Sequence, residues 1–558
     1  MRVVIIGAGA AGLKAACRIR RRDESAEILV IDKEKEISLS RCSLPYYIAG
    51  LIKRDELFKT AFDVLRDKAF FKSSKNIEII DCALAEDIDR KRKKVKINKD
   101  GSIEELDYDF LVIATGAKPV IPNIKGINSY GVFCLYSAKD ADEIIKRLKE
   151  TETVVIIGAG FIGLECCDAF FEHGVDIILV ELTDKVLPTL LDYELAKFVE
   201  SNLKSMGIQL FTKSRVDEII SKDGEVCAVK INNNVVKCQM VLLATGFTPN
   251  VELAKKANLE IGKTGAIKVN SLLQTSDPNI YAGGDCVECK CLITGSEIYI
   301  PSGSIANMHG RVIGNNITGL KTEFKGVLRS LILKVFDLTV GAIGLNEETA
   351  KSLGYDTISA IATFPSDKSH IYPERRPIVL KIVVDKNTKR VLGVQAVGPG
   401  ASDKKLDVFA SIIHSKMSID DLMDIDFAYA PPYSPAINHV NTMGYIVDNK
   451  LRGFLRTIHP IELKRKLESD DDFIILDLRT DAEVKLNRID DRRCIHIPFE
   501  KFRQDFHKIQ NLSKEKEIIL ICSTGYRSYD VLEYLTSNGF KNVRSLEGGF
   551  YLFKAFTR

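Results

Sequence analysis

A glycine-rich turn between an apolar strand and a helix occurs twice in this chain, and it restricts the fold more than any other feature. Residues 2–6 (RVVII) form a β-branched apolar run, and Gly7, Gly9 and Gly12 follow it at the spacing G-x-G-x-x-G. Such glycines allow a tight turn, close approach of a pyrophosphate and close packing of helix on strand, and the helix N-terminus favours negative charge. The first turn therefore predicts a dinucleotide-binding βαβ unit.

A second turn of the same spacing lies later in the chain, after the run TVVII. It contains Gly158, Gly160 and Gly163, and the next apolar strand ends at Glu181, just as the strand after the first turn ends at Asp32. A carboxylate at this strand end accepts hydrogen bonds from a ribose hydroxyl in dinucleotide sites. We therefore expect two dinucleotide-binding units.

Each unit also closes with a similar phrase. These phrases are LVIATGAKP at 111–119 and VLLATGFTPN at 241–250, and NIYAGGDC follows at 279–286. This order of motifs resembles that of the pyridine nucleotide–disulfide oxidoreductases, flavoproteins with two dinucleotide-binding domains, over residues 1 to about 450. The resemblance implies FAD in the first unit, a nicotinamide nucleotide in the inserted second unit, and contact between Asp285 and the ribityl chain of the flavin.

The resemblance also implies individual cofactor-binding positions. Those for FAD are Gly7, Gly9, Ala10, Ala11, Gly12, Asp32, Lys33, Thr115, Gly116 and Asp285. Those for NAD are Gly158, Gly160, Phe161, Ile162, Gly163, Glu181 and Gly246. Because Glu181 would repel a ribose 2′-phosphate, we expect NADH to be preferred to NADPH.

A single cysteine, Cys42, lies in the segment ISLSRCSLPYYIAG. No other cysteine stands between Cys17 and Cys82, so Cys42 has no dithiol partner nearby in the sequence and is expected to act alone. The segment resembles the SFxxCxLPYY signature of coenzyme A (CoA) disulfide reductases, single-cysteine NADH oxidases and NAD(P)H-dependent persulfide reductases. In these enzymes the cysteine lies beside the flavin and cycles through a mixed disulfide, a persulfide or a sulfenic acid. Ser43 departs from the alanine or glycine that is common after this cysteine.

The same resemblance implies a CoA site close to this cysteine. Its positions are Lys14, Arg18, Arg21, Ser38 and Arg41. The spacing of the first three places them on one face of the first helix, where cationic groups can meet the phosphates of the CoA nucleotide. The alternative is that this basic stretch is only a solvated helix face.

Residues 321–450 have the position and the strand–helix character of the family's dimerisation domain. The segment DFAYAPPYSPAINHVNT resembles the one that brings a tyrosine from the partner subunit to the catalytic sulfur, with Tyr429 as the best match and Tyr433 as the second. A phenol can hydrogen-bond to a sulfur leaving group or protonate it. Relatives carry a further tyrosine where this chain has Ile371, and Tyr372 is the residue that could substitute for it.

A separate pattern begins near residue 458. The apolar strand EIILI delivers Cys522 at its end, an amphipathic helix follows, and the phrase LEGGF comes at 546–550. This region resembles a rhodanese domain, a sulfurtransferase whose active loop here is CSTGYR, from Cys522 to Arg527. Backbone N–H groups of such a loop, the helix N-terminus and Arg527 are expected to stabilise a thiolate and then a persulfide anion.

The sequence therefore predicts an α/β protein with two Rossmann-like dinucleotide-binding domains, an α+β dimerisation domain and a C-terminal α/β rhodanese domain. The expected divisions are a FAD-binding domain at 1–115 and 240–320, an NAD(P)-binding domain at 116–239, the dimerisation domain at 321–450 and the rhodanese domain at 458–558.

Composition and charge argue against other classes. The net charge is only +3, no apolar run is long enough to cross a bilayer, and the first residues lack a signal-peptide pattern, so we expect a cytoplasmic protein without a membrane partner. The 13 cysteines have no repeated spacing of the kind found in secreted disulfide frameworks. The basic run 90–94 lies between two strand-like segments and indicates a hairpin rather than a nucleic-acid site.

A metal site is also not expected. The C-x-x-C-x-C spacing of Cys286, Cys289 and Cys291 has no second cysteine pair to complete four ligands. Cys286 also directly follows the aspartate implied to contact the flavin. For Cys166 and Cys167, which lie on the helix after the second glycine turn, core packing is the expected role.

These patterns favour one hypothesis for function. NADH reduces FAD, the flavin reduces sulfur at Cys42, and Cys42 opens a CoA persulfide, polysulfide or disulfide, while Cys522 exchanges sulfur with small thiol carriers in a homodimer. One alternative is an NADH oxidase that reduces oxygen through a sulfenic acid at Cys42. Another is a reductase whose rhodanese unit serves only for docking or sensing. Fusion of two intact cysteine sites in one chain favours the first.

Overall fold

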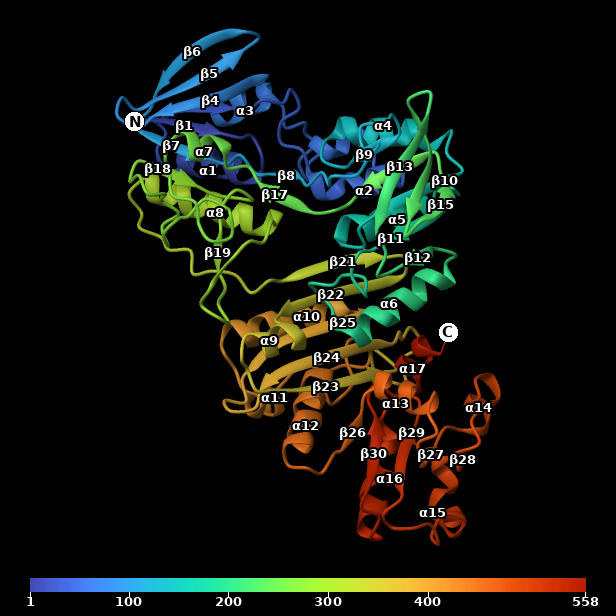
Figure 1. Cartoon of the computed structure of the whole chain (residues 1–558). Coiled ribbons are helices and arrows are strands. Elements are labelled where there is room, and N and C mark those ends of the chain that lie inside the picture. The colour runs from blue at the N-terminus through green and yellow to red at the C-terminus, as the bar shows by residue number, and fades with distance from the viewer. Residues whose placement is uncertain (558) are drawn as a thin grey trace. The chain divides into compact units, whose positions relative to one another are not determined.

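The computed structural model describes residues 1–557, which form two compact units (Figure 1). The first unit comprises Met1–Leu182 and Ser214–Val327. The second comprises Thr183–Lys213 and the chain from Leu328 to the C-terminal end. The chain therefore passes between the units at 182–183, at 213–214 and at 327–328.

The first unit begins with a parallel sheet. Its strands follow the order β18 (Ile280–Ala282), β7 (Phe110–Ile113), β1 (Arg2–Ile6), β2 (Glu27–Ile31) and β3 (Glu78–Ile80). Helices α1 (Ala10–Arg22) and α8 (Gly303–Ile317) supply apolar side chains to the core on one face. The other face packs against an antiparallel sheet, whose residues form a second core cluster with β1 and β7. Burial on both faces explains why the strands are continuous apolar runs.

That antiparallel sheet consists of β4 (Ala83–Asp89), β5 (Lys94–Lys99) and β6 (Ser102–Asp107). The basic run lies at the turn between β4 and β5, which pair antiparallel, so the predicted hairpin is confirmed. Its charges are partly compensated: Arg90 pairs with Asp277 at 2.9 Å, and Lys94 pairs with Glu105 at 2.8 Å.

A second parallel sheet in this unit repeats the pattern. Its strands here follow the order β11 (Asp176–Val180), β10 (Thr153–Ile157), β16 (Met240–Leu243) and β9 (Val132–Cys134), with helix α5 (Phe161–Phe171) after β10. The antiparallel strands β13 (Val216–Lys222), β14 (Glu225–Ile231) and β15 (Asn234–Lys237) pack against it. Short strands β8 (Ala117–Pro119) and β17 (Phe247–Pro249) pair where the chain enters and leaves this half.

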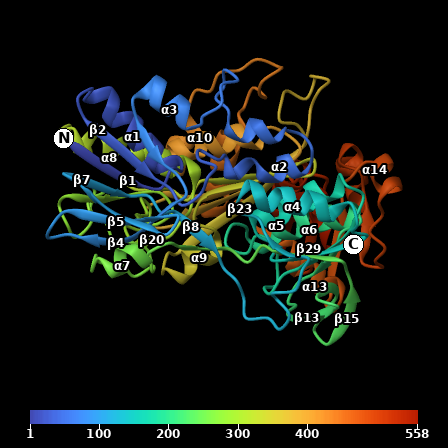
Figure 2. The same cartoon turned by 90° about the horizontal axis from the view of Figure 1, so that it is seen from above.

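Shorter elements complete the first unit (Figure 2). The helices are α2 (Leu44–Ile48), α3 (Lys68–Lys75), α4 (Ala138–Leu148) and α7 (Glu252–Lys256), with single 3₁₀ turns at Arg41–Ser43 and Arg54–Phe58. The last strand pair is β19 (Cys289–Lys290) and β20 (Glu297–Ile298).

The second unit contains an antiparallel sheet flanked by helices. Its strands follow the order β21 (Leu331–Val335), β22 (Leu338–Gly344), β25 (Val391–Gly398), β24 (Ile378–Asp385) and β23 (Thr357–Phe364). The helices are α6 (Tyr193–Ser205), α9 (Glu347–Ser352), α10 (Ser402–His414), α11 (Ile419–Asp424) and α12 (His439–Leu451), and β12 (Gln209–Phe211) follows α6.

A buried ion cluster fixes α6 to this sheet. Lys381 on β24 is 1% exposed, and its ammonium lies 3.0 Å from Asp192, 3.1 Å from Glu194 and 2.9 Å from Glu347. Asp192 also receives the side-chain amide of Gln395 at 2.6 Å. A buried ammonium is tolerated only when its charge is matched in this way, so the segment 183–213 belongs with the later strands and not with its sequence neighbours.

The C-terminal part of the second unit is a parallel sheet with helices on it. Its strands follow the order β26 (Thr457–Ile458), β30 (Val543–Leu546), β29 (Glu517–Ile521), β27 (Phe473–Asp477) and β28 (Cys494–His496). The helices are α13 (Pro460–Leu467), α14 (Asp481–Leu486), α15 (Phe502–Asp505), α16 (Tyr526–Ser537) and α17 (Gly549–Phe553). The α/β class predicted from the motifs is confirmed. No helix within residues 1–557 has both the length and the apolarity to cross a bilayer.

Candidate active sites

The first glycine turn forms a close cradle at the end of β1. Gly7 has a φ of 111°, and a Cβ there would lie 2.2 Å from the carbonyl oxygen of Ala114. A Cβ on Gly12 would lie 2.0 Å from the Gly7 oxygen, so Gly12 is required for packing α1 against the turn. The Ala8 N–H donates to the Asp32 carboxylate at 2.6 Å, which fixes the acid beside the cradle.

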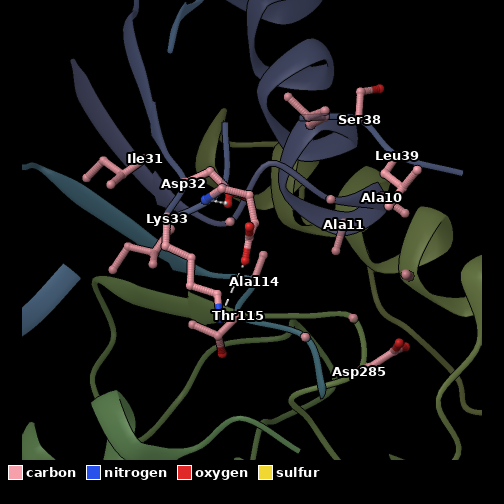
Figure 3. A pocket seen from close by; sticks show the side chains of 18 of the residues that line it. Ala10, Ala11, Ile31, Asp32, Lys33, Ser38, Leu39, Ala114, Thr115 and Asp285 are labelled. Atoms are coloured by element: carbon pink, nitrogen blue, oxygen red, sulfur yellow. Dashed lines mark hydrogen bonds and ion pairs between the residues drawn. The ribbon is translucent and has the colours of Figure 1, made fainter. Parts of the chain in front are cut away.

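One large cavity opens from this cradle (Figure 3). Its volume is about 1130 Å³, and nine of the ten positions predicted for FAD line it, Gly12 being the exception. Asp285 stands at the cavity wall, where its carboxylate accepts the Ser302 N–H at 3.0 Å and burial raises its pKa. The cavity is also lined by a cysteine, a serine and several cationic side chains: Lys14, Arg21, Ser38, Arg41, Cys42 and Arg66.

The second glycine turn has the same construction at the end of β10. Gly158 has a φ of 107°, and a Cβ on Gly163 would lie 2.0 Å from the Gly158 oxygen. The Ala159 N–H donates to the Glu181 carboxylate at 2.8 Å, as Ala8 does to Asp32. Phe161 and Ile162 begin α5, and Gly246 accepts the Val120 N–H at 2.9 Å beside the β8–β17 pair. The predicted nicotinamide positions therefore lie around one strand–helix turn.

Cys42 lies in a 3₁₀ turn (Arg41–Ser43) that leads into α2, and its side chain faces the cavity. The Arg41 guanidinium lies 4.5 Å from the ring centre of Tyr136, and the hydroxyl of Ser43 is hydrogen-bonded to that of Ser40 at 2.9 Å. Burial raises the pKa of Cys42, the carboxylates of Glu165 and Asp285 raise it further, and Arg41 opposes this rise. These surroundings therefore disfavour the thiolate form of Cys42.

Glu165 is a residue of this site that the sequence interpretation missed. It lies on α5, within the mostly apolar stretch FIGLECC, and its proximity to Cys42 links the helix after the second glycine turn to this cysteine. Burial raises the pKa of Glu165 to about 7. The signal for it was an acid two residues after Gly163, within the first turns of a mostly apolar helix.

The Glu165→Gln variant should alkylate faster at Cys42, but only above pH 7. Below that pH the wild-type carboxyl is already protonated, so both proteins should react alike; above it, the variant lacks the negative charge that disfavours a nearby thiolate. We expect a gain of about two- to fivefold at pH 8. The measurement is the rate of iodoacetamide labelling of Cys42 in reduced holoprotein, followed by peptide mass spectrometry. An equal or slower rate at pH 8 would contradict this electrostatic coupling.

The five positions predicted for CoA divide into two groups. Lys14, Arg21, Ser38 and Arg41 line the same cavity as Cys42. Arg18 does not: its Nε donates to the Asn315 side chain on α8 at 2.6 Å. Arg66, which sequence reasoning missed, lines the cavity and donates to the Ser38 carbonyl at 3.1 Å. The cavity that Cys42 lines therefore contains several cations, one of them not evident from the sequence.

The candidate tyrosines lie in the second unit, on the segment between α11 and α12. Tyr429 is 51% exposed and Tyr433 is 72% exposed. The Ser369 N–H donates to the Pro431 oxygen at 3.1 Å, which joins this segment to the one containing Ile371 and Tyr372. Exposed aromatic rings on a connecting segment are available to another surface.

The C-terminal cysteine lies at the end of β29, directly before α16. The Gly525 N–H donates to the Cys522 sulfur at 3.0 Å, and Gly525 has a φ of 104°, a conformation that favours glycine. Arg527 is also hydrogen-bonded to this sulfur. The loop therefore presents a backbone donor, a guanidinium and a helix N-terminus to one thiol, as a stabilised anion requires.

Glu483 on α14 holds the side chains of this loop and was not predicted. Its carboxylate receives both terminal nitrogens of Arg527 at 2.9 and 3.0 Å, and the Ser523 hydroxyl at 2.5 Å. Partial burial opposes ionisation, but these hydrogen bonds lower the pKa of Glu483 to about 2. The sequence carried a signal, because Thr480 and Glu483 form a capping box at the start of α14.

The three clustered cysteines lie in the core. Cys286, Cys289 and Cys291 are all buried, and the sulfur of Cys289 lies 3.8 Å from Nε2 of His309. Within residues 1–557 the structure contains no group of three or more histidine, cysteine or acidic side chains placed to hold a metal ion.

Comparison with known proteins identifies the class. The family described as pyridine nucleotide-disulphide oxidoreductase matches residues 1–310, its dimerisation domain matches 332–441, and the rhodanese-like domain matches 459–556. The chain belongs to the pyridine nucleotide-disulphide oxidoreductases and carries a rhodanese-like domain in addition.

Individual relatives show which enzymes of this class the chain resembles. An NADH oxidase of Methanocaldococcus jannaschii is 39% identical over 78% of this chain and 96% of its own length. An NAD(P)H sulfur oxidoreductase (CoA-dependent) of Pyrococcus furiosus is 37% identical over 78% of this chain and 96% of its own length. Among solved structures, an NAD-dependent persulfide reductase from A. fulgidus is 44% identical and covers 99% of this chain and 100% of its own, with a TM-score of 0.94.

FAD and NAD(P)H are the cofactors of this family, and the residues present fit them. The cavity joins the glycine cradle, the Asp32 carboxylate and Asp285, so a pyrophosphate, a ribose and a ribityl chain each meet a suitable group. The second turn offers a similar cradle, with the Glu181 carboxylate where a ribose hydroxyl would need an acceptor.

Proposed function

We propose that this chain uses NAD(P)H and FAD to reduce CoA-linked persulfide, polysulfide or disulfide sulfur at Cys42, and that Cys522 transfers sulfane sulfur to or from small thiol carriers. The observation that carries this proposal is the shared cavity, in which the first dinucleotide cradle, Asp285, Cys42 and the cations Lys14, Arg21 and Arg41 meet. A cavity that contains both a cysteine and several cations suits a thiol substrate that carries phosphates.

The residues that would hold FAD are the first glycine turn, Asp32, Thr115 and Asp285, and those that would hold the nicotinamide nucleotide are the second glycine turn and Glu181. Bound FAD supplies two-electron transfer between the nicotinamide and a sulfur beside its ring. We propose NADH as the preferred donor, because the negative charge of Glu181 opposes a 2′-phosphate.

The sulfur chemistry of this chain begins at Cys42. Its thiolate attacks the CoA-bound sulfur of a CoA persulfide; the S–S bond breaks, hydrosulfide leaves, and Cys42 is joined to CoA in a mixed disulfide. Two electrons from NADH and one proton then convert the mixed disulfide to the Cys42 thiolate and the CoA thiol. We assign Tyr429, contributed by the partner subunit of a homodimer, as the phenol that hydrogen-bonds the leaving sulfur.

The CoA moiety would be held by the cations of the cavity. We assign Lys14, Arg21, Arg41 and Ser38 to this role because they line the cavity, and we add Arg66, which lines it too. Arg18 would contribute through its bond to Asn315 on α8, by holding the two helices together, rather than from the cavity wall. We place the reaction in the cytoplasm, a setting suited to the 13 cysteines, all of which are free thiols.

A panel of acceptors tests this function. NADH oxidation by the purified yellow holoprotein should be fastest with CoA persulfide or polysulfide, slower with glutathione persulfide, and slow with oxygen alone; NADPH in place of NADH should lower kcat/KM by about tenfold or more. The M. jannaschii relative named NADH oxidase makes oxygen the second candidate acceptor. Oxygen consumption that accounts for all NADH oxidised, with no sulfide release under argon, would favour that candidate instead.

A further inference from the structure

The segment Leu546–Tyr551 lies directly against the rhodanese active loop. The Phe550 N–H donates to the Cys522 carbonyl at 2.8 Å, and the Tyr551 N–H donates to the Ser523 carbonyl at 3.0 Å. A Cβ on Gly549, whose φ is 61°, would lie 2.6 Å from both the Ser523 oxygen and the Thr524 nitrogen. The backbone of the loop is therefore fixed by residues 549–551.

The other side of the same segment is bonded to the dimerisation domain. The Gly548 N–H donates to the Ile361 carbonyl at 3.2 Å, and the fully buried Thr363 hydroxyl donates to the Gly548 carbonyl at 2.7 Å. Both partners lie on β23, the last strand of the dimerisation sheet. Only one peptide step, from Gly548 to Gly549, separates the contact with β23 from the contact with the loop.

The neighbouring residue Glu547 adds a second attachment at this junction. Lys450 on α12 donates both to the Glu547 carboxylate and to the Ser359 carbonyl on β23, the latter at 2.6 Å. Thr457 donates to the same carboxylate at 2.9 Å. Because these groups are mostly buried, their hydrogen bonds cannot be exchanged for water without cost.

A separate contact reaches the active loop itself. The hydroxyl of Tyr526, the fifth loop residue, interacts with that of Thr442 on α12, which also donates to the Asn438 carbonyl at 3.2 Å. Tyr526 is also the first residue of α16, so this contact lies at the helix end that faces the Cys522 sulfur. The loop is thus connected to the dimerisation side of the unit both through residues 546–551 and through Tyr526.

We propose that the reductase part of the chain completes the rhodanese active site, with Thr363 and Thr442 as positioning residues for the loop Cys522–Arg527. This inference rests on the proposed sulfur transfer at Cys522. The Gly525 N–H meets the sulfur only in one loop conformation, and the contacts from β23 and α12 hold that conformation.

The test uses the full chain and the variants Thr363→Val, Thr442→Val and the double variant. The matched control is Thr357→Val: Thr357 lies on the same strand β23, is buried, and its hydroxyl has no hydrogen-bond partner. Thr363→Ser keeps the hydroxyl and should behave like wild type. Each valine variant exchanges a hydroxyl for a methyl group, so an effect of that exchange alone would also appear in Thr357→Val, whereas an effect of losing the hydrogen bond would not.

Two readouts separate the outcomes. Hydrogen exchange at the loop amides and at Phe550 and Tyr551 should accelerate by about tenfold in the double variant and not in the control. The kcat of sulfur transfer should fall by about five- to tenfold, with NADH-dependent reduction at Cys42 unchanged. The melting temperature should fall in the Thr363→Val and double variants, because the buried Gly548 carbonyl loses its hydroxyl donor.

Unchanged loop exchange in the double variant would overturn the proposal, whatever the activity. Accelerated exchange with wild-type kcat would overturn the positioning role as well. A wild-type chain that transfers no sulfur but reduces CoA persulfide normally would refute the sulfur-transfer function at Cys522 and this inference with it, a result distinct from the other two.

Discussion

Replacing Cys42 with serine will abolish NADH-driven sulfide release from CoA persulfide. A hydroxyl at this position is too weak a nucleophile to open an S–S bond and cannot form the mixed disulfide, so turnover should fall by at least ~10³-fold. The cavity and its cofactor-binding residues remain, because Cys42 lies on a short exposed turn and makes none of the cradle contacts. The bound flavin should therefore keep its absorption spectrum.

The measurement is sulfide released per NADH oxidised, under argon, by the purified holoprotein. Cys227→Ser is the matched control, since Cys227 is an exposed free cysteine on β14, away from the cavity lining. Retention of sulfide release in the Cys42 variant would remove the basis of the proposed function.

Replacing Cys522 with serine should eliminate sulfur transfer while leaving reduction at Cys42 intact. The Gly525 N–H donates to the sulfur of residue 522, and an oxygen in place of that sulfur cannot carry sulfane sulfur as a persulfide. We expect no detectable transfer from a persulfide donor to a small thiol, and NADH-dependent reduction of CoA persulfide within about twofold of wild type.

Mass spectrometry of the peptide containing residue 522 gives the second measurement. Wild type incubated with a persulfide donor should gain one sulfur atom there, as should the control Cys494→Ser, which alters a half-buried cysteine of the same domain. Sulfur transfer that persists in the Cys522 variant would contradict this prediction and favour a docking or sensing role for the rhodanese unit.

The sequence alone was sufficient to predict the features that depend on a few adjacent residues. The two glycine turns and their acidic strand ends predicted the α/β class, because the spacing of Gly7, Gly9 and Gly12 leaves few backbone solutions. The same holds for the loop after β29, where strand, cysteine and helix are contiguous.

The sequence alone was not sufficient to predict contacts between residues that are far apart in the chain. Nothing near Glu165 indicates that it approaches Cys42, and nothing near Arg66 places it in the cavity. By its spacing, Arg18 shares a helix face with Lys14 and Arg21. Its guanidinium nevertheless donates to Asn315 on α8, a contact that helix periodicity cannot reveal. Likewise, no local pattern assigns residues 183–213 to the second unit.

The ion cluster around Lys381 sets an order of events during synthesis. Asp192 and Glu194 leave the ribosome well before Lys381 and Gln395, the groups that neutralise and hydrogen-bond them. Until then α6 has no stable place to dock, and its apolar face stays available to chaperones or to other nascent chains. The second unit can therefore fold only after most of the polypeptide has been synthesised. The first glycine turn, in contrast, lies among the first residues to be synthesised.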